Sequence, residues 1–240
     1  MKYLYFLLFP ISIVAQDKFK VEYERRYFIN LNDPNPESKK LREDVFSKPK
    51  YIELSVEGNR CLSKEIEKID NSQGPQYTMK VIGGFKDLET YTDFDQNQKV
   101  ILREMDSKVY NILDTVSQLK WTLTRETKSI NGYETKKAVY KDKDYEYVAW
   151  YTTTIKSKCG PESFYGLPGL LLELKRTSLQ DDKQYSTYKL VSISEDSKIK
   201  LEKPSKGNSV SVSDFEKIEE KYYQKIQEMV KPSQGVDKKD

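Results

Sequence analysis

The stretch FYGLPGLLLEL at residues 164–174 is the part of the sequence that decides the fold. Pro168 fixes φ for the second position of a β-turn, and Gly169 suits the positive φ that follows in a type II turn. A residue before proline favours extended backbone, so we expect Leu167 to enter the turn from a strand-like stretch. Residues 170–174 are almost continuously apolar, which is typical of a short strand covered on both faces. This stretch therefore predicts a turn that leads into a central strand.

The same turn allows a second interpretation, as a loop that contacts a ligand. Gly166 either relieves a backbone clash or lets another group approach the backbone closely. If that group is a ligand, the candidate binding residues are Gly166, Leu167, Pro168 and Gly169.

An aromatic strand is expected shortly before the turn, at residues 145–155. Alternation places Tyr145, Tyr147 and Tyr151 on one face and Trp150 on the other. Such tyrosines either pack in a core or form a stacking platform for a sugar ring or an apolar ligand. Trp150 and Tyr151 therefore complete the candidate binding set.

Alternation of polar and apolar residues begins at Phe19 and recurs along most of the chain. Gly58-Asn59 and Asn131-Gly132 are strong hairpin signals. The charged stretch that ends near Pro49 is expected to be irregular. The pattern predicts further strands at residues 51–56, 61–66, 77–82, 88–94, 99–104, 108–113, 121–126, 133–141 and 185–193.

One helix is expected near the C-terminus, because Ser213 and Glu216 have the spacing of a capping box and an apolar stripe follows. It should reach Val230, before Pro232. The expected fold is mainly β (α+β): a long antiparallel meander that can curl into a half-barrel, with one amphipathic C-terminal helix packed on it.

The N-terminus has the features of a signal peptide at residues 1–15. Lys2 precedes a short apolar run, and Ala15 is the small residue expected before cleavage. The predicted localisation is periplasmic or secreted, without stable membrane insertion after cleavage; an uncleaved anchor is the alternative. Residues 16–240 are then about 225 residues, enough for a single β-rich domain.

Composition excludes several classes of chemistry. The chain has 41 basic and 38 acidic residues, interspersed, so no basic stripe favours nucleic-acid binding. It has no histidine, which removes Ser-His and Cys-His catalysis and imidazole metal ligands. No glycine-rich phosphate loop follows a predicted strand. We therefore expect no catalytic residues, no metal and no cofactor, and the one catalytic arrangement left open is a pair of carboxylates.

Cys61 and Cys159 are the only cysteines. In an exported protein they can form a disulfide if the fold brings their Cα atoms within about 7 Å. The alternative is two free thiols, and the sequence leaves both open.

Residues 121–176 resemble the GLPGLI family, secreted or periplasmic proteins of Bacteroidetes-type bacteria whose biochemical role is not established. The resemblance rests on the 164–174 stretch, on Gly160-Pro161 before it, and on a threonine-rich strand after Trp121. Two positions depart from the family pattern: Thr135 stands where many members have cysteine, and Leu171 replaces an isoleucine. The resemblance implies an exported protein but no reaction.

Three functions remain open at this stage. We favour a non-catalytic binding protein of the bacterial envelope, whose partner is an envelope protein or a small apolar or sugar ligand. The first alternative is a half-barrel carrier of lipid or acyl chains, which needs an apolar cavity. The second is a carboxylate-only hydrolase, which needs two facing carboxylates in a cleft.

Overall fold

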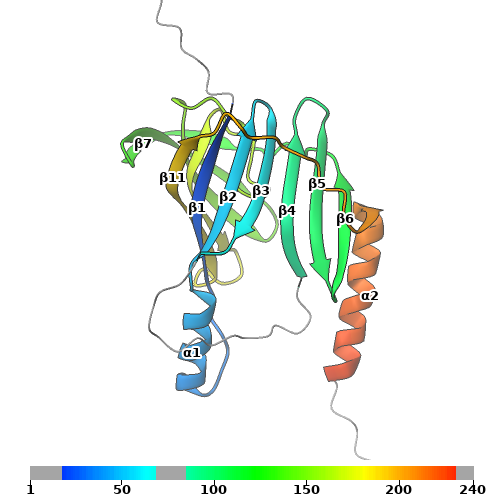
Figure 1. The fold of residues 1–240 in the computed structure, drawn as a ribbon. Helices are drawn as coiled ribbons and strands as arrows, with labels where there is room; N and C mark the ends of the chain where they lie inside the picture. The colour runs from blue at the N-terminus through cyan, green and yellow to red at the C-terminus, as the bar shows by residue number, and fades with distance from the viewer. Residues whose placement is uncertain (1–17, 69–84, 231–240) are drawn as a thin grey trace, which may run out of the picture.

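The computed structural model describes residues 18–68 and 85–230. They form one open twelve-stranded sheet with two helices, and the strand order is β12-β6-β5-β4-β3-β2-β1-β11-β10-β9-β8-β7. Figure 1 shows the sheet curling, so that its yellow and yellow-green strands pass behind β1 and β2 while the green β4 to β6 lie beside β3. The predicted signal peptide and the strand predicted at 77–82 lie outside the described residues.

The elements have the following bounds: β1 (Lys18–Phe28), α1 (Pro36–Phe46), β2 (Lys50–Glu57), β3 (Arg60–Ile66), β4 (Phe85–Asp93), β5 (Gln98–Met105), β6 (Lys108–Asp114), β7 (Thr122–Ile130), β8 (Tyr133–Lys141), β9 (Tyr145–Thr152), β10 (Leu170–Ser178), β11 (Tyr185–Glu195), β12 (Asn208–Ser211) and α2 (Val212–Val230).

The sheet is built from two antiparallel meanders, β1 to β6 and β7 to β11. They join where β1 pairs with β11, from Phe19↔Glu195 to Phe28↔Tyr185. The predicted mainly-β fold, with a long open sheet and a C-terminal helix, is confirmed. The sequence did not predict β12, which pairs parallel to β6.

Helix α1 occupies a stretch that was expected to be irregular, so that prediction was wrong. The Asn35 side chain accepts hydrogen bonds from the backbone N–H groups of Glu37 and Ser38, and Pro36 opens the helix. An asparagine cap followed by proline is a recognised helix start. No residue of α1 is buried, so an apolar stripe could not have revealed the helix.

Helix α2 follows the prediction but begins differently. Ser211, rather than Ser213, accepts the hydrogen bond from the backbone N–H of Asp214, at 3.1 Å. The Phe215 ring packs edge-on against Tyr110 at 5.3 Å between ring centres, which seats the helix against β6 and β12. No helix of the described residues has the length and apolar character needed to cross a membrane.

The main apolar core lies inside the curl, and two smaller cores lie over β4 to β6. Ile199 and Leu201 cover Tyr91 and Val100 in one of the small cores. Strand β1 contributes fully buried Phe19, Val21 and Tyr23 to the main core.

Candidate functional site

Residues 153–169, between β9 and β10, fill the inside of the curl; we call this segment the plug. Its Ile155, Phe164 and Leu167 side chains are buried in the main core. The plug contacts β3, which is separated from β10 by β11, β1 and β2, so it crosses the inner face of four neighbouring strands. The chain itself therefore occupies the interior that an acyl carrier would need to keep open.

A disulfide between Cys61 on β3 and Cys159 holds the plug to the sheet, with Cα atoms 5.9 Å apart. Of the two states that the sequence left open, the structure has the bonded one. The bond closes a loop across a sequence separation of 98 residues.

A second attachment lies three residues further along the plug, at Glu162. Its carboxylate accepts hydrogen bonds from an Arg25 guanidinium nitrogen and from the Tyr188 hydroxyl, the latter at 2.7 Å. Its backbone N–H donates to the Ser63 hydroxyl oxygen at 2.9 Å. Glu162 has φ of 54°, in the left-handed region that a non-glycine residue rarely adopts. These contacts offset the backbone strain.

Arg25 links Glu162 to a second carboxylate, Glu65, at 2.6 Å. We call Arg25, Glu65, Glu162 and Tyr188 the ionic anchor. Burial raises the pKa of Glu65, but Lys50, Arg25 and Lys86 outweigh that effect and hold the pKa below its usual range. Arg25 brings Glu65 and Glu162 to one site, but a general acid needs a raised pKa, and the pKa of Glu65 is lowered.

The two glycines of the turn have roles different from those predicted. Gly166 adopts φ of +88°, and a Cβ added there would meet nothing within 4 Å. Gly169 does not adopt positive φ; a Cβ there would lie 2.0 Å from the backbone oxygen of Thr152. The predicted type II turn at Pro168-Gly169 is therefore wrong. Gly169 is needed because β9 and β10 approach each other closely.

The structure separates the residues of the candidate binding set. Tyr151 and Leu167 are each 2% exposed and belong to the main core, whereas Gly166 and Pro168 lie at the surface. Trp150 is only partly buried, and the Lys128 ammonium lies over its ring at 4.5 Å. These residues do not form a common aromatic platform.

Trp121, which carried part of the family resemblance, holds the plug from another direction. Its indole Nε1 donates a 2.9 Å hydrogen bond to the backbone oxygen of Tyr165. No pattern in the sequence linked these two residues, because they lie 44 positions apart.

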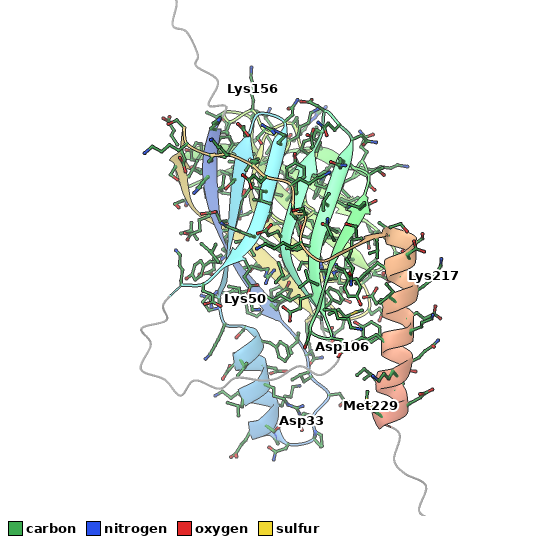
Figure 2. All side chains as sticks on the ribbon, turned by 45° about the vertical axis from the view of Figure 1, so that its right-hand side comes forward. Asp33, Lys50, Asp106, Lys156, Lys217 and Met229 are labelled. Atoms are coloured by element: carbon green, nitrogen blue, oxygen red, sulfur yellow. A yellow bond between two sulfur atoms is a disulfide. The ribbon has the colours of Figure 1, made fainter. Side chains whose placement is uncertain are left out.

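A cleft of about 600 Å³ lies at the C-terminal end of β1, next to Phe28, between α1 and the start of β11. Figure 2 shows α1 below the end of the sheet, beside the labelled Asp33, which lies just before the helix. Phe28 and Tyr185 line the cleft with stacked rings whose centres are 4.5 Å apart. The cleft was not predicted, because it depends on α1.

Charged side chains of both signs surround the rings. Lys39 is hydrogen-bonded to the Asn30 side-chain oxygen at 3.2 Å and lies 3.7 Å from Glu43. Asp182 and Lys183 also line the cleft; both are exposed, and neither side chain has an ion-pair partner among the described residues. Among the described residues no three side chains of the metal-ligating types come together in an arrangement that could hold an ion.

Comparisons with known proteins identify a fold and a short family match. A family model described as "Protein of unknown function (Porph_ging)" matches residues 141–173, which run from the end of β8 through β9 and the plug into β10. No curated protein matches the chain.

Two solved structures of PNGF-II, in the P21 and C2 space groups, are similar to 86% and 85% of this chain, with TM-scores of 0.56 and 0.54 and 17% identity in each case. The matched region is 34% and 33% of those chains, so this chain spans about a third of PNGF-II. The likeness shows a shared fold only.

The LolA superfamily protein NE2245 from Nitrosomonas europaea aligns with 81% of this chain and 89% of its own, at 12% identity and a TM-score of 0.32. A score this low carries no functional argument.

Proposed function

We propose that this chain is an exported, non-catalytic binding protein of the bacterial envelope, related to the GLPGLI family, and that it takes its ligand in the cleft beside α1. The volume of about 600 Å³ carries this proposal, because ligand sites are typically about 300–1,000 Å³. The inside of the curl is occupied by the plug, so the cleft beside α1 offers a ligand more room than the inside of the curl does.

The lining of the cleft defines the chemistry of the ligand. The stacked Phe28 and Tyr185 rings offer a floor for a flat or apolar group. Lys39 and Lys183 stand beside Glu43, Asp44 and Asp182, so the rim can pair with both signs of charge. A short peptide with an apolar side chain between a cationic and an anionic residue fits this arrangement.

Two features support export to an oxidising compartment. The apolar run that ends at Ala15 has the form of a signal peptide. The disulfide between Cys61 and Cys159 is of a kind that persists outside the cytosol.

The binding test uses three probes, each titrated calorimetrically into the protein: the tripeptide Lys-Phe-Glu, the sugar chitotriose and palmitate. We expect Lys-Phe-Glu to bind, and the D182N/K183Q variant to weaken binding by about tenfold through loss of the rim charges. The matched control is D106N/K108Q, on the turn between β5 and β6 that Figure 2 labels at Asp106.

Two results would contradict this proposal. If palmitate binds and Lys-Phe-Glu does not, the carrier alternative is favoured. If both variants bind Lys-Phe-Glu equally, the cleft is not the site.

A further inference from the structure

The two edges of the described sheet differ in their protection. At one edge, β12 is only four residues long and runs directly into α2, which packs against β6 and β12. At the other edge, β7 is nine residues long and pairs with β8 alone among the described strands. Nearly all its side chains are exposed, including Leu123 at 52%. An open edge of this kind presents unpaired backbone groups to another strand.

The hairpin geometry identifies which backbone groups of β7 point outward. Asn131-Gly132 is a two-residue turn, flanked by the pair Ile130↔Tyr133. In such a hairpin the flanking pair is hydrogen-bonded, and bonded and non-bonded pairs alternate along the regular part of the pairing, from Ile130↔Tyr133 to Thr127↔Lys136. Between Thr127 and Leu123 the register with β8 shifts, so the regular edge ends at Thr127. The N–H and C=O groups of Ser129 and Thr127 therefore point away from β8.

The open edge also carries a local excess of positive charge, although charges of both signs are interspersed along the chain. Residues 120–143 contain seven Lys or Arg and three Asp or Glu, a net charge of +4, whereas the whole chain carries +3. Lys128 and Lys137 are paired with Glu173 and Glu126. Within the described residues no ion-pair partner is found for four exposed cations of this region: Lys120, Arg125, Lys136 and Lys141.

We propose that β7 binds an extended, acidic segment of a partner protein, which pairs with its outer edge as an additional strand. Lysine and arginine on an edge strand repel the same edge of a second copy of this chain. The same charges attract a strand that carries carboxylates, while the outward groups of Ser129 and Thr127 supply the main-chain hydrogen bonds. Leu123 can contact an apolar side chain of the added strand.

The test measures fluorescence anisotropy of a labelled peptide, Glu-Thr-Glu-Val-Glu-Thr-Glu, against the full chain. We expect binding that weakens as salt is raised from low to physiological ionic strength. R125E/K136E should weaken it by about tenfold or more, because it reverses two free charges. S129P should weaken it similarly, since proline removes the outward N–H without removing a bond to β8.

Two controls separate this surface from general charge and from the cleft. K108E/K200E makes the same change of charge at exposed lysines on β6 and beyond β11, and should bind the peptide normally. D182N/K183Q should also bind it normally, so this proposal and the cleft proposal fail independently. Melting temperatures of all variants establish that each is folded.

Three outcomes would overturn the proposal. One is the absence of peptide binding to the unmodified chain. Another is full binding by a folded S129P variant, which would mean that charge alone attracts the peptide. The third is equal binding of a single-stranded oligonucleotide or of phosphatidylglycerol vesicles, which would make the surface a general anion-binding patch.

Discussion

The hydroxyl of Tyr23 on β1 donates a 2.7 Å hydrogen bond to the backbone oxygen of Leu171 on β10, although β11 lies between these strands. The pairing of β10 with β11 covers only Glu173↔Lys189 to Thr177↔Tyr185. On the other side of β10, the register with β9 shifts between Leu171 and Glu173. The first residues of β10 therefore depend on a side chain from inside the curl, directly after the plug ends.

Replacing Tyr23 with phenylalanine should destabilise the protein by about 1–3 kcal/mol, because a buried backbone oxygen loses its donor. Burial raises the pKa of Tyr23 well above its usual value, so the phenol remains a neutral donor throughout the accessible pH range. Urea unfolding measures the effect. Y223F, at an exposed tyrosine on α2, is the control, and equal midpoints for the two variants would contradict this role of Tyr23.

Gly169→Ala should destabilise the fold by more than the ~1 kcal/mol typical of an unfavourable glycine replacement, because its Cβ would meet the Thr152 oxygen at 2.0 Å. Gly166→Ala meets no neighbour and introduces only the strain of a positive φ. Thermal melts should therefore rank G169A as the more damaging change. The reverse order would mean that the contact with Thr152 is relieved at little cost and that the positive φ of Gly166 is the stronger requirement for glycine.

Loss of the Cys61–Cys159 disulfide should destabilise the protein by about 4–5 kcal/mol if loop-closure entropy dominates, given the sequence separation of 98 residues. Urea unfolding with and without dithiothreitol measures this difference. The C61S/C159S variant should behave like the reduced protein and no longer respond to dithiothreitol. Two reactive thiols in protein from an oxidising compartment would show that the bond does not form.

Acid should weaken the ionic anchor. The pKa of Glu65 is lowered in the folded state, so its contribution to stability is fully present above the unfolded-state value of about 4.5. That contribution is lost as the pH falls through the lower folded-state pKa. We expect E65Q to reduce the dependence of the unfolding free energy on pH below 4.5, and E134Q, at an exposed glutamate, to leave it unchanged. An identical pH profile for E65Q would remove Glu65 from this role.

Export should remove residues up to about Ala15, since the apolar run ends there at a small residue. N-terminal sequencing of protein from the periplasm or the medium should then begin at Gln16. A retained Met1 would contradict the signal peptide.

Local signals predicted most of the sheet, but contacts between distant residues determined the site. Alternation and the Asn131-Gly132 turn marked hairpins because strand pairing there is local. Pro168-Gly169 suggested a positive φ, yet the Thr152 oxygen across the strand pair determines why glycine is required. The ionic anchor could not be found in the sequence, since Arg25 and Glu162 lie 137 positions apart among many other charged residues.

The pairing of β1 with β11 also has a kinetic consequence. Strand β1 begins the described sequence and β11 comes late in it, yet the two adjoin in the middle of the sheet, so the contact order of the fold is high. During synthesis, β1 to β3 emerge long before β11 and the plug. The apolar face of β1 to β3 therefore stays exposed until these later segments can cover it. Folding dominated by such distant pairings is slow, and the waiting strands are exposed to aggregation. We therefore expect the unfinished chain to need protection, by a chaperone or by rapid transfer, until residue 195 has emerged.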